Sequence, residues 1–196
     1  MDKTIEYYNR NVEAFVSETV DVDFSQVQDL FLQMLPEKSR ILDFGCGSGR
    51  DTKYFSDRGY FVEPVDGSLE ICKSAAGRTG IPVRNMLFQE LCEQQKYDGI
   101  WACASILHLS KLDLFDVIEK MANALKSNGV IYASFKYGFF EGERNGRYFT
   151  DFTEESFVKF IEGMKRLTIQ KIWVTGDVRS ERGKEQWLNI IMRKAD

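Results

Sequence analysis

The chain has 196 residues, 43% of them hydrophobic, which is enough for one well-buried core and short for two domains. Its formal net charge of −4 argues against a nucleic-acid partner, because proteins that hold the phosphate backbone usually present a basic surface. No apolar run is long enough to span a bilayer, and the four cysteines form no Cys-x-x-Cys pair. We therefore expect a cytoplasmic protein with reduced thiols and no membrane partner.

Short apolar runs alternate with helical segments along the chain. Strands are predicted at 40–44, 60–65, 82–84, 98–104 and 130–135, and helices at 50–58, 68–77, from Ser110 to Asn128-Gly129, and from Thr153 to about Glu162. The predicted inward stripe of the third helix consists of Leu112, Phe115, Ile118, Met121, Ala122 and Leu125. Two final β runs, 167–174 and 187–192, flank a polar loop over 179–185 whose acids and bases alternate.

This alternation predicts an α/β protein with a Rossmann-like, doubly wound, seven-stranded sheet. Six strands are expected to be parallel. The two final runs have no helix between them, so they form an antiparallel C-terminal hairpin at one edge. We interpret residues 1–196 as a single domain, in which a helical segment over 1–35 precedes a core over 36–196.

A glycine cluster follows the first predicted strand, in the run Asp43-Phe44-Gly45-Cys46-Gly47-Ser48-Gly49. Ligands of such sheets bind at the carboxyl ends of strands, and glycines there allow close backbone approach. A dinucleotide fingerprint requires a third glycine where Arg50 stands, and the Gly-Lys-Ser/Thr ending of a phosphate-binding loop is also absent. The spacing therefore disfavours both alternatives.

The run resembles the acidic-x-Gly-x-Gly-x-Gly motif of class I S-adenosylmethionine-dependent methyltransferases. Those enzymes also carry an acidic residue at the end of the second strand, where Asp66 stands in this chain. Similar segments occur at 97–101, at 105–109, where an apolar run contains His108, and in the Leu-Lys-Ser-Asn-Gly turn at 125–129. The resemblance is strongest to small bacterial-type members of the tellurite-resistance and thiopurine-like group.

The resemblance implies S-adenosylmethionine as the cofactor and assigns roles by position. Asp43 orders the turn, and Gly45, Cys46, Gly47 and Gly49 line the methionine moiety. Asp66 holds the ribose, with Gly67 and Ser68 beside it; the alternative is a carboxylate that only caps the following helix. Met86 and Leu87 support the adenine or merely pack in the core. Cys103 and Ala104 end the fourth strand under the cofactor, and no metal is expected because Cys103 lacks companion ligands.

His108, the single histidine, is a candidate general base, with a purely structural histidine as the alternative. The resemblance places a lid at the N-terminus, where Tyr7 and Tyr8 are candidate substrate residues. A loop over 136–149 is expected to recognise the acceptor, and its candidate residues are Lys136, Tyr137, Arg144, Arg147 and Tyr148. The alternative is a surface loop anchored by its phenylalanines.

These features predict an S-adenosylmethionine-dependent methyltransferase that acts on a small-molecule acceptor, as a monomer or homodimer. A protein methyltransferase is an alternative. A non-catalytic cofactor-binding sensor or inactive partner subunit is another, and an NAD-dependent oxidoreductase is disfavoured by Arg50.

Overall fold

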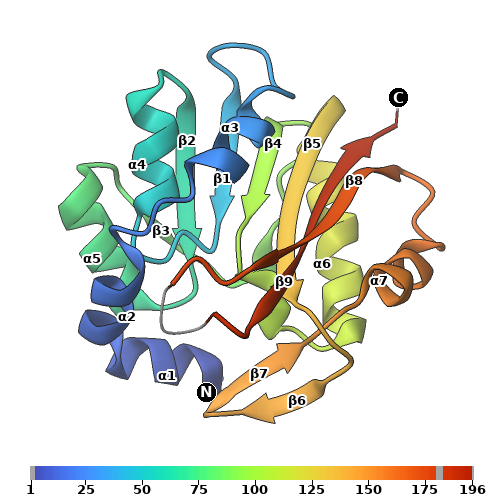
Figure 1. The fold of residues 1–196 in the computed structure, drawn as a ribbon. Coiled ribbons are helices and arrows are strands. Elements are labelled where there is room, and N and C mark those ends of the chain that lie inside the picture. The colour runs from blue at the N-terminus through green and yellow to red at the C-terminus, as the bar shows by residue number, and fades with distance from the viewer. Residues whose placement is uncertain (1–2, 180–182, 196) are drawn as a thin grey trace.

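A computed structural model describes residues 3–179 and 183–195. Seven strands form one sheet in the order β3-β2-β1-β4-β5-β9-β8 (Figure 1). Their bounds are β1 Arg40–Phe44, β2 Phe61–Asp66, β3 Arg84–Asn85, β4 Tyr97–Ala102, β5 Leu125–Lys136, β8 Leu167–Gly176 and β9 Gln186–Lys194. β9 runs antiparallel to both its neighbours, and the other pairings are parallel. The predicted fold class, including the C-terminal edge hairpin, is confirmed.

Helices cover both faces of this sheet (Figure 1). Their bounds are α1 Lys3–Arg10, α2 Val12–Thr19, α3 Ser25–Leu32, α4 Arg50–Asp57, α5 Leu69–Thr79, α6 Lys111–Ala124 and α7 Glu154–Ile161, with short 3₁₀ turns η1 Phe88–Glu90 and η2 Ile106–His108. α3 and α4 pack on one face, while α6 and α7 pack on the other. α1 and α2 lie at the end toward which the parallel arrowheads point, where a site is expected.

Three helices begin directly after a residue whose side chain caps them. The side chain of Ser68 accepts a hydrogen bond from the backbone N–H of Ile71, and that of Ser110 accepts one from the N–H of Asp113. Thr153 caps α7 in the same way. Each oxygen satisfies an N–H that has no partner within the helix, so the strand-to-helix joints are fixed locally.

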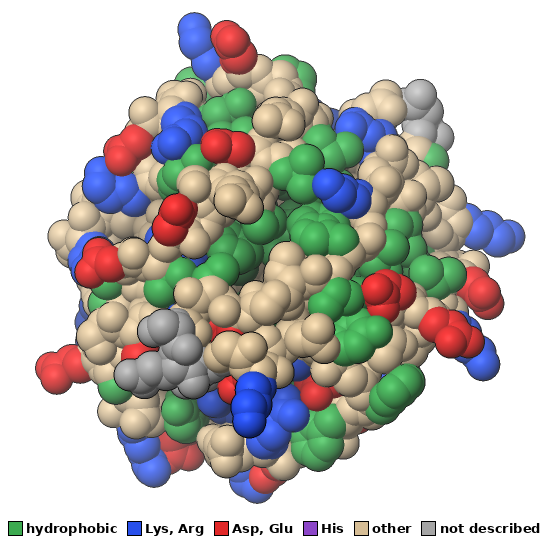
Figure 2. Space-filling view, viewed as in Figure 1, with side chains coloured by type: hydrophobic (Ala, Val, Ile, Leu, Met, Phe, Trp, Pro, Cys, Tyr) green, Lys and Arg blue, Asp and Glu red, His purple; other side chains and the backbone are tan. Residues whose placement is uncertain are grey.

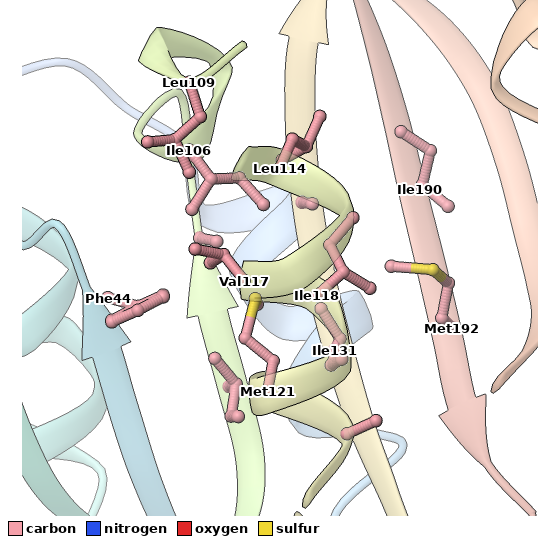
Figure 3. Packing of buried hydrophobic residues seen from close by; sticks show 14 of the residues in the cluster. Phe44, Ile106, Leu109, Leu114, Val117, Ile118, Met121, Ile131, Ile190 and Met192 are labelled. Carbon is pink, nitrogen blue, oxygen red and sulfur yellow. The ribbon is translucent and has the colours of Figure 1, made fainter. Parts of the chain in front are cut away.

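The buried face of α6 differs from the predicted stripe. Leu114, Val117, Ile118 and Met121 pack against one face of the sheet in one cluster with Phe44, Ile131 and Ile190 (Figure 3). Leu112 was predicted to face inward and is 77% exposed. It precedes Met121 by nine residues, about 2.5 turns at 3.6 residues per turn, and therefore lies on the opposite side of the helix. The prediction for Leu112 was wrong.

The end of α6 was also misplaced. Asn128-Gly129 was expected to close the helix, but α6 ends at Ala124 and both residues lie within β5. The register advances from Leu125 to Val130 on β5 while β4 advances only from Tyr97 to Gly99. Asn128 has φ = 62°, a left-handed conformation that asparagine tolerates. The Asn-Gly pair thus accommodates an irregularity in the strand.

The segment 136–149, predicted as a loop, contains a β-hairpin. β6 (Glu141–Arg144) pairs antiparallel with β7 (Arg147–Thr150), and Asn145 and Gly146 make the turn with φ of 53° and 76°. Asn-Gly between two extended runs is the strongest short hairpin signal, because the turn requires positive φ at both positions. This hairpin lies beside α1, although about 140 residues separate them in the chain (Figure 1).

The remaining features concern β3, the polar loop and the surface. β3 begins two residues later than predicted and covers only Arg84–Asn85. Part of the predicted polar loop, 180–182, lies outside the described residues. No helix in the described ranges is long and apolar enough to cross a membrane. Figure 2 shows acidic and basic side chains scattered among one another over the face it presents.

Candidate active site

The glycine turn joins β1 to α4 at the carboxyl edge of the sheet. Gly45, Gly47 and Gly49 have φ of 88°, 52° and 78°, values that residues other than glycine rarely adopt. A Cβ on Gly45 would lie 2.4 Å from the Cβ of Ser105, which follows β4. Ser105 also donates a hydrogen bond to the backbone oxygen of Phe44 (2.6 Å). Both the backbone conformation and the neighbouring strand therefore require glycine here.

Asp66 ends β2 directly beside this turn. Parallel pairing places Val65 opposite Phe44, so the next residue on each strand reaches the same edge. The N–H of Gly47 donates to Oδ2 of Asp66 (3.1 Å), and the N–H of Ser68 donates to Oδ1 (2.9 Å). Burial raises the pKa of Asp66 to about 6, although these N–H groups favour the charged form. The two elements of the sequence motif are thus brought together.

Asp43 lies under the turn instead of in the cavity. Its side chain is buried and accepts a hydrogen bond from the hydroxyl of Thr52 on α4. Burial, and next the neighbouring Asp51, raise the pKa of Asp43. The position fits the predicted role of ordering the turn.

A cavity of ≈ 230 Å³ extends from the turn and Asp66. Of the predicted cofactor residues, it is lined by Gly45, Cys46, Gly47, Asp66, Gly67, Leu87, Cys103 and Ala104. Met86 is buried beneath, with its N–H donating to the backbone oxygen of Asp66, and Gly49 and Ser68 support the turns from behind. Ala104 has φ = 50° and donates its N–H to Ser134 on β5 (2.8 Å), so the chain leaves β4 in a fixed direction.

One end of the cavity is closed by α1, α2 and the β6–β7 hairpin. Tyr8 from α1, His108 from η2 and Arg147 from β7 line it, and Phe15 from α2 lies over Gly47. The hydroxyl of Tyr8 is 2.9 Å from Nε2 of His108 and 3.4 Å from Nη1 of Arg147. Three segments that are distant in the sequence therefore meet at this end.

Another part of the cavity lining contains a group that sequence reasoning missed. Asp177, after β8, accepts hydrogen bonds from Arg179 (2.6 Å) and from the indole N–H of Trp187 (3.0 Å). Burial raises its pKa, but these bonds outweigh burial and hold the pKa below the ordinary range. Lys136 lies 3.6 Å from Asp177 and 3.9 Å above the Trp187 ring, and it pairs with Glu185. Lys136 is the predicted substrate residue that belongs to this group.

Arg50 and Asp51, at the start of α4, form a second missed group. The Arg50 guanidinium pairs with Asp51 (2.7 Å), reaches Sγ of Cys103 (3.8 Å) and packs against the Phe24 ring. Asp51 also accepts hydrogen bonds from Gln28 and Trp101, so its carboxylate is satisfied inside the protein. From the sequence, Arg50 showed only that the third glycine of a dinucleotide-binding fingerprint is absent. No rule of residue spacing points to Asp51.

Four predicted substrate residues are placed away from the cavity lining. Tyr137 bonds to Glu154, Arg144 pairs with Asp151, and the Tyr148 hydroxyl bonds to Glu141. Tyr7 packs under Arg147 and against Tyr8. Tyr148 instead contributes its backbone carbonyl, which is 2.6 Å from Nδ1 of His108.

Within the described ranges, no three His, Cys, Asp or Glu side chains are grouped as metal ligands.

Comparisons with known proteins agree with this geometry. Residues 41–129 match a family model described as a methyltransferase domain. The crystal structure of 1,6-didemethyltoxoflavin-N1-methyltransferase from Burkholderia thailandensis, with bound 1,6-didemethyltoxoflavin and S-adenosylhomocysteine, has a TM-score of 0.77 at 22% identity. The match covers 98% of this chain and 85% of that chain. The fold is that of the class I S-adenosylmethionine-dependent methyltransferases.

Two curated relatives match part of this methyltransferase fold. YqeM of Bacillus subtilis (strain 168), named as a candidate methyltransferase, is 30% identical over 114 residues, which are 52% of this chain and 46% of that protein. The ubiquinone biosynthesis O-methyltransferase of Bartonella quintana (strain Toulouse) is 28% identical over 127 residues, 62% of this chain and 50% of that protein. The chain thus spans about half the length of the curated relatives it matches.

The residues that match the methyltransferase domain model form only part of the cavity lining. Residues 41–129 contain the glycine turn, Asp66, Leu87 and His108. Tyr8, Arg147 and Asp177 lie outside that range and line the remaining wall.

Proposed function

We propose that this protein is an S-adenosylmethionine-dependent methyltransferase that acts on a small-molecule acceptor. The observation that carries the proposal is the meeting of the glycine turn and Asp66 at one cavity, joined by the hydrogen bond from the Gly47 N–H to Asp66. A single nucleoside can span from this carboxylate to the turn.

The residues present fit the cofactor. Asp66 is a half-buried carboxylate at the cavity wall that takes part in no ion pair among the described residues, so a ribose diol can donate to its remaining lone pairs. Leu87 and Phe88 offer an apolar wall for the adenine, and Gly45 to Gly49 leave room for the methionine moiety. When bound, the cofactor supplies an electrophilic methyl group on sulfur.

The protein's own contribution is alignment and exclusion of water. α1 is tied to the start of α5, because Asn9 accepts hydrogen bonds from the Ser68 hydroxyl and the Glu70 N–H. It is tied to the β6–β7 hairpin by the Lys3–Glu143 ion pair and the bond from the Tyr148 N–H to Thr4. Orientation of two reactants in such an enclosed site can supply about 7–11 kcal/mol of barrier lowering.

The enclosure also supports a small acceptor. A cavity of ≈ 230 Å³ that is roofed by α1, α2 and a hairpin admits a metabolite more readily than a folded protein surface. We assign the lid to α1 and α2, and not to the whole of 1–35, because α3 buries Phe31 completely against the sheet. The single-domain organisation and the placement near the tellurite-resistance and thiopurine-like members are further parts of this proposal.

Calorimetry tests the cofactor, and a transfer assay tests the activity. We expect S-adenosylmethionine and S-adenosylhomocysteine to bind, and NAD not to bind. Binding of NAD with neither adenosyl ligand bound would overturn the proposal. A panel of small metabolites with radiolabelled methyl donor separates an enzyme from a cofactor-binding sensor, because a sensor binds the donor and transfers nothing.

A further inference from the structure

A chain of polar groups crosses one end of the cavity and connects three segments. The Tyr8 hydroxyl lies 2.9 Å from Nε2 of His108, and Nδ1 of His108 lies 2.6 Å from the backbone oxygen of Tyr148. Nη1 of Arg147 lies 3.4 Å from the same Tyr8 hydroxyl. Tyr8, His108 and Arg147 all line the cavity.

The partners of His108 determine its tautomer. A backbone carbonyl can only accept, so Nδ1 must carry the hydrogen. In the neutral ring, Nε2 then has a lone pair, and the Tyr8 hydroxyl donates to it. The lone pairs of the Tyr8 oxygen consequently remain available toward Arg147 and the cavity.

The guanidinium of Arg147 is positioned to bind an anion. Its guanidinium lies 4.5 Å from the Tyr7 ring and 5.1 Å from the Phe149 ring, and it forms no ion pair with the part of the chain that the structure describes. Its Nε–H is buried and has no hydrogen-bond partner in the described structure. A buried donor on an uncompensated charge is costly, and a bound oxyanion removes that cost.

We propose that this end of the cavity binds an acceptor through an acidic hydroxyl, an enol or a phenol, and that Tyr8 and His108 form its proton relay. The inference rests on the proposed function. The acceptor hydroxyl gives its proton to the Tyr8 oxygen while Tyr8 gives its own proton to Nε2 of His108. Arg147 stabilises the resulting oxyanion. The oxygen then forms a bond to the methyl carbon as the carbon–sulfur bond breaks, and the sulfur keeps that electron pair in S-adenosylhomocysteine.

The surroundings of Tyr8 hold its phenol in the protonated form. Burial raises the pKa of Tyr8, and Arg147 only partly offsets this, so the phenol stays protonated until the acceptor arrives. His108 also lines a second depression, together with Lys3, Asp113, Glu143 and Tyr148. Lys3 and Glu143 form an ion pair there, so their charges largely cancel.

The relay is tested first without any acceptor, because the chain has a single histidine. Its ¹⁵N-labelled imidazole gives one set of resonances, and their shifts report the tautomer and its titration. We expect the Nδ1–H tautomer in the wild type and a changed imidazole titration in Tyr8→Phe. The matched control is Tyr54→Phe, which removes a hydroxyl that bonds to Asp29 elsewhere, and should leave the titration unchanged. An Nε2–H tautomer, or identical titrations in all three proteins, overturns the relay.

The anion site is tested with 4-nitrophenol added to the S-adenosylhomocysteine complex, because its ionised form absorbs visible light. We expect the bound nitrophenol to ionise at lower pH than in water. Arg147→Gln should abolish that shift and weaken binding at least about tenfold, the effect of a charged hydrogen bond. Arg166→Gln is the control, since Arg166 bonds to Asn123 on the surface.

Failure of the proposed function and failure of the acceptor assignment would give different results. If the wild type does not bind S-adenosylhomocysteine by calorimetry, the proposed function falls, and the relay falls with it. If that ligand binds equally well to wild type and Arg147→Gln, but nitrophenolate binding is absent or unchanged by the substitution, only the acceptor assignment falls.

Discussion

Asp66→Ala removes a half-buried carboxylate that faces both the glycine turn and the cavity. A hydrogen bond to a charged group contributes about 1.5–3 kcal/mol. At about 1.4 kcal/mol per tenfold change in Kd, loss of the ribose contact should weaken S-adenosylhomocysteine binding about 10- to 150-fold. Isothermal titration calorimetry at pH 8, where the wild-type carboxyl is ionised, measures this change.

The same substitution should have a smaller effect on folding. The rise in the pKa of Asp66 from its ordinary 3.8 to about 6 means that holding the charge inside the folded protein costs roughly 3 kcal/mol above that pH. Alanine removes this cost, but it leaves the N–H groups of Gly47 and Ser68 without their acceptor, at about 1–3 kcal/mol each where water does not reach. The two effects oppose each other, so the net change in the free energy of unfolding lies between a gain of about 1 and a loss of about 3 kcal/mol, and we expect the thermal midpoint to shift by no more than about 10 °C.

The pair of measurements gives a clear refutation. If Asp66→Ala keeps its fold and binds S-adenosylhomocysteine within twofold of wild type, Asp66 does not hold the ribose. The carboxylate would then serve only to join the two turns, which is the alternative that the sequence left open.

Three other results are expected. Cofactor affinity should weaken as pH falls through about 6, because protonated Asp66 loses its charged hydrogen bonds. Calorimetry between pH 8 and pH 5 measures this change, and a constant Kd would disprove the prediction. Gly45→Ala should lower the free energy of unfolding by at least about 2 kcal/mol through both strain and overlap, whereas Gly59→Ala, with φ = 83° and no atom of the described chain within 4 Å of its Cβ, should cost only about 1 kcal/mol. Met121→Ala should destabilise by about 2–5 kcal/mol in urea titrations and Leu112→Ala by less than about 0.5 kcal/mol, and equal effects would contradict the buried face of α6.

Local patterns predicted the parts of the fold that local physics determines. Ser68 and Ser110 cap helices because an oxygen at that position meets an N–H three residues later, and such spacing is visible in a sequence. Asp66 directly follows the predicted strand over 60–65, so its position at a strand end could also be predicted. The hairpin at Asn145-Gly146 was missed although its signal is local, because the flanking residues were interpreted as a substrate loop.

The acceptor end could not be predicted in this way. Tyr8 and His108 are 100 residues apart, and their contact depends on α1 crossing the sheet edge toward η2. Asp177 belongs to the cavity only because β8 pairs with β9, which turns the end of that strand toward Lys136. Tertiary packing places these groups, and no periodicity or spacing in one sequence encodes it.

The division of the cavity wall has a consequence for specificity. The domain match covers the turn and Asp66, which the proposal assigns to the cofactor, while Tyr8, Arg147 and Asp177 come from an N-terminal helix, the β6–β7 hairpin and the sheet edge. These segments reach the cavity through side chains and do not carry the glycine turn, so substitutions in them can alter the acceptor end while β1, β2 and the turn stay as they are. A protein of this fold therefore keeps its cofactor site while its acceptor site changes, and the acceptor must be inferred from those three residues and their charges.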